Sequence, residues 1–331
     1  MKDPITYLTN CTVYSTVKQD DDEAGWLAAR TRGIGGSDIG AICGVSPYSS
    51  ARQIYFQKTG QFEDSNRIGA AQKDRMHFGH VLEPVVADEY ARRTGAKLCT
   101  ANATMCHKDY PWALANIDRF IVDDTGKPIG VLECKTTSEY GNSDWEEGNL
   151  PISYIYQLNW YLWITGLERG AFACLVGGNK FYEYDVWRND DLLNDIMIPA
   201  AIKFWDDVQN LRMPELQAQD TEFVNEQHQA VVKNSEIILD DDAANDLAET
   251  VVVCKAKIKE LEATLAEAQN RLKERLTVNE IGYTHDYIIK WSPRAQNRID
   301  TDKLKSEYPE VYTKCIKRIE FRAMSVRGGV V

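Results

Sequence analysis

The chain has 331 residues, of which 44% are hydrophobic and 27% charged, and its formal net charge is −12. This length suits one large domain with an appendage, or two domains, with enough apolar residues for a substantial core. No apolar run is long enough for a membrane span, and the first residues contain no apolar signal region. The eight cysteines include no C-x-x-C pair. This argues against a zinc knuckle or an iron–sulfur cluster, and we expect reduced thiols in a cytosolic protein.

Charge is distributed unevenly along the chain. Residues 213–250 contain one Lys and ten acids, whereas residues 251–331 contain sixteen Lys and Arg and eleven acids. A net negative charge is not typical of a nucleic-acid-binding protein, so any such surface must be local. The simplest interpretation of the basic tail is a solvated surface.

Helix signals dominate the first hundred residues, after a loose leader at residues 1–23. Gly60 and Gly95 are typical of residues that follow a helix, and residues 33–37 predict a Gly-rich turn. Residues 61–70 predict a mobile connection. The expected helices are Glu23–Arg30, Asp38–Cys43, Ser50–Thr59 and Arg75–Thr94, the last of which carries Glu83.

Strands alternate with helices over the next hundred residues. Residues 123–128 have turn chemistry, so the strands on either side of them are expected to form a hairpin. The pattern predicts an α/β fold with a mixed central sheet flanked by helices. The expected strands are Thr104–His107, Trp112–Val122, Ile129–Thr136, Gly170–Gly177 and Phe181–Trp187, and the expected helices are Ser153–Thr165 and Asp190–Arg212.

Three segments are expected after this core, which ends at residue 212. Residues 213–243 predict an acidic linker, and residues 244–280 a long helix, because small and apolar residues recur at alternating steps of three and four. The sequence leaves open whether this helix pairs with another chain or packs within its own. The repeat comprises Ala244, Leu247, Val251, Cys254, Ile258, Leu261, Leu265, Ala268 and Leu272. Residues 281–331 predict a small basic α+β unit, with strands at His285–Trp291 and Phe321–Val326 around a helix at Thr301–Tyr308.

Three chemically important side chains meet at the predicted hairpin. Asp118 lies on its first strand, and Glu133 and Lys135 lie on its second, where alternation places them on one face and Cys134 on the other. Two carboxylates so close together repel each other unless a cation lies between them, and Mg²⁺ suits such a pair. Lys135 could orient or deprotonate an attacking water, or offset charge on a phosphate. From spacing alone, an ordinary hairpin with solvated charges is an equally good interpretation.

Four blocks in order resemble the YqaJ-like viral recombinases, also called lambda-type exonucleases, within the PD-(D/E)xK nucleases. They are WLAARTRGIGGSDIG (26–40), GHVLEP (79–84), NID with ECK (116–118 and 133–135) and YIYQLNWYL (154–162). Ile117 stands where the name of the superfamily has Pro. The resemblance implies a restriction-endonuclease-like core domain over residues 24–212.

The resemblance also implies roles for individual residues. Asp118 and Glu133 would be metal ligands together with the backbone carbonyl of Cys134, and the ion would be Mg²⁺, with Mn²⁺ as a substitute. Glu83 matches a helix-borne acid that faces the metals, although a helix-surface acid is the alternative. The implied catalytic set is Glu83, Asp118, Glu133, Lys135 and Gln157.

A second set of residues matches the family's positions for a 5′-terminal phosphate. Arg30 and Ser37 flank the Gly-rich turn, where backbone N–H groups can approach a phosphate and Arg can grip it with two hydrogen bonds. Arg32, Asn116 and Tyr154 are further candidates for contacts to the phosphate or the DNA.

The implied function is a Mg²⁺-dependent double-strand DNA exonuclease of phage or prophage recombination. It would digest one strand from a 5′-phosphorylated end and leave a 3′ overhang, in the cytoplasm of a bacterial host. Implied partners are double-strand DNA ends, a RecT-like single-strand annealing protein and further copies of the chain, commonly as a trimeric ring, with no membrane. One alternative is an endonuclease of restriction or repair type, which would cut closed circles. Another is a non-catalytic scaffold that binds DNA ends.

Overall fold

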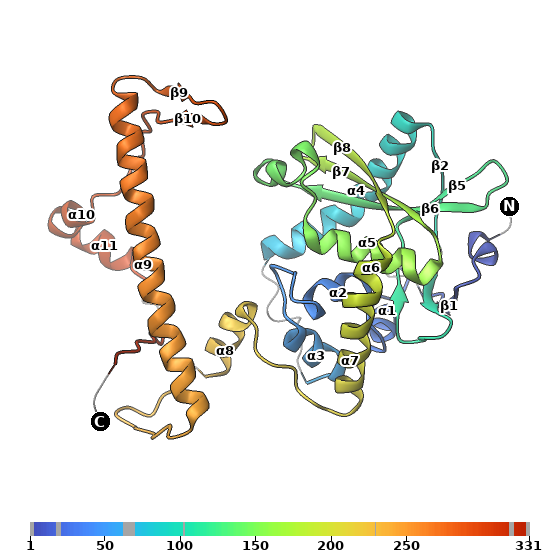
Figure 1. Cartoon of the computed structure of the whole chain (residues 1–331), viewed down its shortest axis with the longest axis horizontal. Coiled ribbons are helices and arrows are strands. Elements are labelled where there is room, and N and C mark those ends of the chain that lie inside the picture. Colours follow the sequence, from blue (N-terminus) through green and yellow to red (C-terminus); the bar gives the residue numbers. More distant parts are fainter. Residues whose placement is uncertain are drawn as a thin grey trace. The chain divides into compact units, whose positions relative to one another are not determined.

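The computed structural model of the chain describes residues 3–17, 21–61, 70–101, 103–228, 230–317 and 321–328. The chain divides into two compact units, Met1–Val224 and Asn225–Val331. The first unit contains the predicted α/β core, and the second contains the long helix and the small C-terminal elements (Figure 1). The division falls beyond residue 212, where we predicted the core to end.

A five-stranded mixed sheet forms the centre of the first unit, as predicted. Its strands, in spatial order, are β2 (Lys97–Cys99), β5 (Arg119–Val122), β6 (Pro128–Thr137), β7 (Arg169–Val176) and β8 (Lys180–Trp187). Only β6 and β7 are parallel, and every other neighbouring pair is antiparallel. A parallel pair needs a crossover connection, and helix α5 (Ile152–Thr165) supplies it between these two strands.

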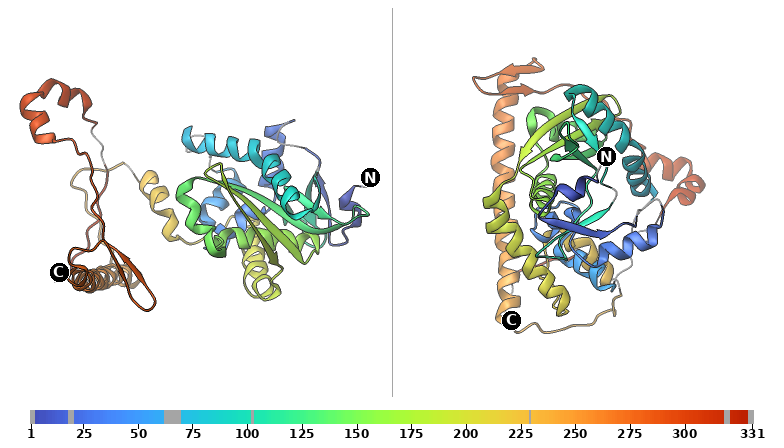
Figure 2. Two further views of the ribbon diagram at one scale, coloured as in Figure 1. Left: turned by 90° about the horizontal axis from the view of Figure 1, so that it is seen from above. Right: turned by 90° about the vertical axis from the view of Figure 1, so that its right-hand side faces the viewer.

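Helices cover both faces of this sheet (Figures 1 and 2). Alternation along β6 sends Leu132 toward α4 (Ala70–Thr94), where it joins a buried cluster with Val86 and Tyr90. Val131, one residue earlier, joins the main core on the α5 side, together with Leu158. Because Glu133 and Lys135 have the same parity as Val131, they are also directed to the α5 side.

A second, three-stranded sheet explains two differences from the sequence predictions. It consists of β1 (Cys11–Ser15), β3 (Thr104–His107) and β4 (Leu114–Ala115). The described part of the predicted loose leader therefore contributes a strand, paired with β3, as well as a short 3₁₀ turn at Pro4–Tyr7. The predicted strand Trp112–Val122 is interrupted, because β4 pairs with β3 whereas β5 pairs in the central sheet. Residues 116–118 make the passage between the two sheets.

The remaining helices of the first unit begin and end at recognisable signals. The Asp22 side chain accepts from Gly25 N at the start of α1, and Ser50 and Gln53 form a reciprocal cap at the start of α3. Gly60 ends α3 with a positive φ, a conformation open to glycine. The bounds are α1 (Glu23–Thr31), α2 (Gly36–Ile42), α3 (Ala51–Thr59), α6 (Asp190–Leu192) and α7 (Ile198–Gln209), with a π-helical turn at Leu193–Met197 and 3₁₀ turns at Glu139–Asp144, Glu146–Gly148 and Ala218–Asp220.

The first part of the predicted linker packs on the core instead of leaving it. The buried Asp220 accepts a hydrogen bond from Ser50 Oγ, and Arg52 Nε donates to the carbonyl of Pro214 at 2.8 Å. The ring of Phe223, in α8 (Thr221–Gln227), lies 5.1 Å from that of Phe56. These contacts of scattered side chains leave no periodic signal in the sequence, which is why this segment was predicted to be a linker.

The second unit contains the predicted long helix, α9 (Asp242–Leu276), capped by Asp241. A hairpin of β9 (Ile281–Tyr283) and β10 (Ile288–Lys290) follows, and then α10 (Thr301–Glu307) and α11 (Pro309–Cys315). The predicted strand Phe321–Val326 is wrong, since those residues are irregular. Residues 288–290 pair with the strand just before them, so they need no C-terminal partner. Within the described ranges, no helix is long and apolar enough to cross a membrane.

Candidate active site

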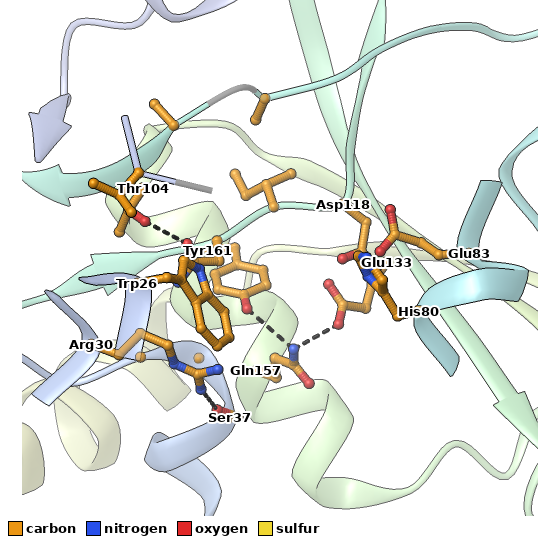
Figure 3. Close-up of a pocket in the computed structure, with 17 residues that line it drawn as sticks. Trp26, Arg30, Ser37, His80, Glu83, Thr104, Asp118, Glu133, Gln157 and Tyr161 are labelled. Atoms are coloured by element: carbon orange, nitrogen blue, oxygen red, sulfur yellow. Dashed lines mark hydrogen bonds between the residues drawn. The ribbon is translucent and has the colours of Figure 1, made fainter. Parts of the chain in front are cut away.

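Most of the predicted site residues line one pocket of the first unit (Figure 3). One side of it is acidic, with Glu83 from α4, Asp118 from the passage between the sheets and Glu133 from β6. The other side contains Trp26 and Arg30, both from α1. Ser37, Asn116, Gln157 and Tyr161 also line it. The fold therefore brings together residues that lie far apart in the sequence.

Glu133 is the centre of a hydrogen-bond network between β6 and α5. Its Oε1 atom accepts from Lys135 Nζ at 2.7 Å and from Gln157 Nε2 at 2.6 Å. Lys135 Nζ also donates to Gln157 Oε1 at 3.1 Å, and Gln157 Nε2 lies 3.2 Å from the hydroxyl of Tyr161. The Lys135 ammonium lies 4.6 Å from the centre of the Tyr154 ring. Tyr154 thus contacts the predicted lysine but does not line the pocket.

Asp118 owes its position to the break between β4 and β5. Its Oδ2 atom accepts a hydrogen bond from the backbone N–H of Cys134 at 2.8 Å. Arg119, the next residue, donates from Nη1 to Glu83 Oε1 at 2.5 Å. Sequence reasoning missed Arg119, because nothing in its local pattern distinguishes it from a charge at the edge of a strand. Its effect is to tie the acid of α4 to the central sheet.

Burial and mutual repulsion shape the electrostatics of the acidic side. Burial, and then the charges of Glu133 and Glu83, raise the pKa of Asp118 well above its usual range. Burial also raises the pKa of Glu133, although the neighbouring Lys135 opposes that shift. Burial alone would lower the pKa of Lys135, but the charges of Glu133 and Asp118 outweigh it and raise the pKa. A cation placed between the two carboxylates would relieve their repulsion.

The residues present fit a divalent metal ion held by few protein ligands. Glu133 Oε2 is buried and has no hydrogen-bond partner within the described ranges, so one carboxylate oxygen of a pocket-lining residue is left unused. No three His, Cys, Asp or Glu side chains of the described segments are grouped closely enough for a complete cage. A hard cation held by Asp118, Glu133 and a backbone carbonyl, with water and phosphate oxygens completing its shell, matches this arrangement.

Arg30 lies on the side of the pocket away from the acidic group. Its Nη2 atom donates to Ser37 Oγ at 2.9 Å, and its guanidinium lies 4.6 Å from the centre of the Trp26 ring. Asn116 accepts from Thr104 Oγ1 at 2.6 Å and faces the same pocket. Arg32 is exposed and is not among the lining residues, so the structure does not bring this candidate into the site.

A buried ion pair that sequence reasoning missed holds the backbone of Arg30 in place. Lys58 Nζ, on α3, lies 2.7 Å from Asp38 Oδ2 and donates to the carbonyl of Arg30 at 2.9 Å. The same Asp38 oxygen accepts from Gly35 N at 2.8 Å. Burial alone would raise the pKa of Asp38, but Lys58 and Arg30 lower it overall. The Gly-rich turn and the arginine are therefore fixed by one lysine from another helix.

A pocket lined by three carboxylates and an arginine, with a lysine bonded to one of the carboxylates, suits metal-dependent hydrolysis of phosphodiesters. A family model described as YqaJ-like viral recombinase domain matches residues 25–168. The chain is 35% identical over 308 residues to a protein of Bacillus subtilis (strain 168) named Uncharacterized protein YqaJ, covering 91% of this chain and 93% of that protein. The chain belongs to the YqaJ family, as its sequence blocks predicted.

Two solved structures resemble part of the chain. An alkaline exonuclease from Laribacter hongkongensis is 16% identical, with a TM-score of 0.46, and the match covers 62% of this chain and 97% of that one. A phage-related exonuclease from Haemophilus somnus 129PT is 11% identical, with a TM-score of 0.38, and the match covers 54% of this chain and 96% of that one. Family membership and the geometry of the pocket agree in indicating a nuclease.

Proposed function

We propose that the chain is a Mg²⁺-dependent exonuclease that digests double-strand DNA in the 5′-to-3′ direction and leaves 3′ single-strand overhangs. One observation carries this proposal: the acidic group and the Arg30–Ser37 pair line the same pocket. A terminal phosphate held by the arginine would place the next phosphodiester at the acids. Each cut then produces a new 5′ phosphate, which is the group that the pocket binds in the following cycle.

The side chains divide this work between them. Arg30 and Ser37 bind and orient the terminal phosphate, and Gln157 fixes the Lys135 ammonium against Glu133. Lys135 contributes a positive charge beside Glu133, so it stabilises the negative charge that develops on the phosphate. Asp118 and Glu133 would hold the ion. When bound, Mg²⁺ would supply Lewis-acid polarisation of the phosphate and a more acidic water.

The partners that the family implies are part of the same proposal. We expect double-strand DNA ends as the substrate, a RecT-like annealing protein to receive the 3′ strand, and a homo-oligomer such as a trimeric ring. A bacterial cytoplasm would contain the DNA and would keep the cysteines of the chain reduced. Co-purification with the annealing protein and sedimentation of the chain would test the two assemblies.

Digestion of three DNAs in Mg²⁺ tests the activity directly. The substrates are linear DNA with a 5′ phosphate, the same DNA with a 5′ hydroxyl, and a covalently closed circle. We expect rapid loss of the phosphorylated linear DNA, slower loss of the hydroxyl form and an intact circle. Cutting of the circle would indicate an endonuclease, and binding of ends without cutting would indicate a scaffold.

The matched variant for this assay is Lys135→Ala. Removing one ammonium that stabilises the reacting phosphate should lower the cleavage rate by about 10²-fold or more. DNA binding should stay close to that of the wild type, because the phosphate contacts at Arg30 remain. Full residual activity would exclude Lys135 from the mechanism.

A further inference from the structure

Within the second unit, helix α9 leaves an apolar stripe uncovered along most of its length. The helix has 35 residues and is unbroken (Figure 1), so it is about 50 Å long. Several large apolar side chains of the repeat are exposed, with Leu247 at 69%, Leu261 at 68% and Leu265 at 58% of their full accessibility, whereas Leu276 at the end of the helix is buried. Soluble proteins rarely expose contiguous apolar surface of this extent unless another surface covers it.

The spacing of the stripe matches the seam of a coiled coil and not the broader face of a helix packed on a sheet. Steps of three and four between small or apolar residues continue from Ala244 to Leu272, and a charged residue, Arg275, occupies the d position of the fifth heptad. The a positions are Ala244, Val251, Ile258, Leu265 and Leu272, and the d positions are Leu247, Cys254, Leu261, Ala268 and Arg275. In the first three heptads, β-branched residues at two of the a positions, Val251 and Ile258, combine with Leu at two of the d positions. That combination favours two parallel strands.

The residues that flank the seam are compatible with the same arrangement. In a parallel, in-register pair, each g residue faces the e residue five positions later on the other helix. Lys257 then faces Glu262 of the second copy, and the reverse contact forms by symmetry. The other g–e pairs are Thr250 with Lys255, Thr264 with Gln269 and Arg271 with Leu276. None of these pairs opposes like charges, and one joins opposite charges twice.

We propose that α9 pairs with α9 of a second copy of this chain as a parallel, two-stranded coiled coil. The occupant of the stripe is thus another copy, held by the a and d side chains and by the Lys257–Glu262 contacts. None of the seam residues lines the active-site pocket, so pairing joins nuclease units, whether single or already assembled in rings, without any residue of the site.

The native cysteine at the d position gives a direct test. In a parallel, in-register pair the two Cys254 side chains face each other across the seam, whereas an antiparallel pair centred on the helix separates them. Cys315 is also exposed, so the full chain is used as the Cys315→Ser variant and oxidised with diamide. We expect a covalent dimer on a non-reducing gel. The fraction linked should exceed about two thirds, the limit for a three-stranded bundle in which one cysteine of three stays unpaired.

Two variants control this experiment. Replacing Cys254 by Ser in the same background should remove the covalent dimer. In that double variant, Glu249→Cys introduces a cysteine at the outer f position of the helix. This cysteine should restore little of the covalent dimer. Equal linkage from positions 249 and 254 would mean random collision and would overturn the proposal. Linkage that stops at two thirds would overturn the two-stranded arrangement.

Association without covalent links provides the second measurement. Leu261→Glu places a charge in the seam, whereas Ala263→Glu places the same charge at an outer position. Sedimentation equilibrium of the full chains should show association weakened about tenfold or more by the first and unchanged by the second. Monomeric wild-type chain at micromolar concentration, or equal effects of the two variants, would contradict the pairing. Cleavage of short linear DNA by both variants checks that the first unit remains folded, and it tests the proposed activity separately.

Discussion

At the scale of single residues, the pocket places acidic side chains in a buried environment. Burial disfavours a negative charge on Glu133 and Asp118, Lys135 opposes that effect, and Arg119 pairs with the neighbouring Glu83. The unused Glu133 Oε2 atom is the clearest sign that a further positive group belongs there. We therefore propose that the pocket takes a cation and a phosphate, and each side chain can be tested separately.

Arg30→Ala should abolish the preference for 5′-phosphorylated over 5′-hydroxyl ends. The guanidinium is the cation on the phosphate side, and losing a bidentate charge-assisted contact typically costs about 2 kcal/mol, or roughly thirtyfold in the ratio of cleavage rates. Arg32→Ala is the matched control, because that arginine is exposed and outside the pocket. An unchanged ratio in Arg30→Ala would place the phosphate pocket elsewhere.

Glu133→Gln should remove most of the stabilisation that Mg²⁺ gives to the folded chain. An ion that binds only the folded state raises its stability by mass action, and the amide supplies neither the charge nor the second carboxylate oxygen. Thermal unfolding with Mg²⁺ and with a chelator measures this without any DNA. A shift in Tm as large as that of the wild type would show that Glu133 does not hold the metal.

At the scale of elements, the position of α1 depends on α3. The Lys58–Asp38 pair is almost completely buried, with side chains 5% and 8% exposed, and Lys58 also binds the carbonyl of Arg30. A pair of equal length, Lys203–Asp207, has an exposed lysine, and its aspartate has a second partner in Arg212. The two pairs look alike as distances, but burial makes only the first one costly to break.

Lys58→Met should lower the free energy of unfolding by about 3 kcal/mol or more and weaken the preference for 5′-phosphorylated ends. Lys203→Met should cost about 0.5 kcal/mol or less. The pKa of Asp38 is lowered in the folded chain, so its contribution is complete above the ordinary value near 4. This contribution to stability is lost as the pH falls through the pKa that Asp38 has in the folded chain. The loss of unfolding free energy in Lys58→Met should therefore be largest at neutral pH and smaller in acid. Urea titrations at several pH values would measure it.

At the scale of the whole molecule, the boundary between the units decides which truncations are tolerated. The segment from Pro214 to Phe223 packs on α3, although its composition resembles a linker. A chain ending at residue 227 retains these contacts, and a chain ending at residue 212 loses them. Removing the buried Phe223 alone is expected to cost about 3–5 kcal/mol.

We expect the chain 1–227 to cleave linear DNA at an initial rate within about threefold of the full chain, since it contains every residue of the pocket. It should no longer associate through α9. The chain 1–212 should unfold at a much lower temperature or fail to accumulate. Equal Tm values for the two truncations would show that the packed segment adds nothing to stability.

The sequence by itself determined the features that depend on local periodicity. Alternation along residues 129–136 placed Glu133 and Lys135 on one face, and the heptad pattern predicted α9, because these patterns involve neighbours within a few positions. Four sequence blocks predicted the family. Only the tertiary structure decided which distant side chains meet: Arg119 with Glu83, Lys58 with Asp38, and Asp220 with Ser50. It also decided where the strand at residues 112–122 breaks, because each half pairs in a different sheet. A local pattern limits which face a side chain occupies, but the partner across that face is fixed by packing of the whole chain.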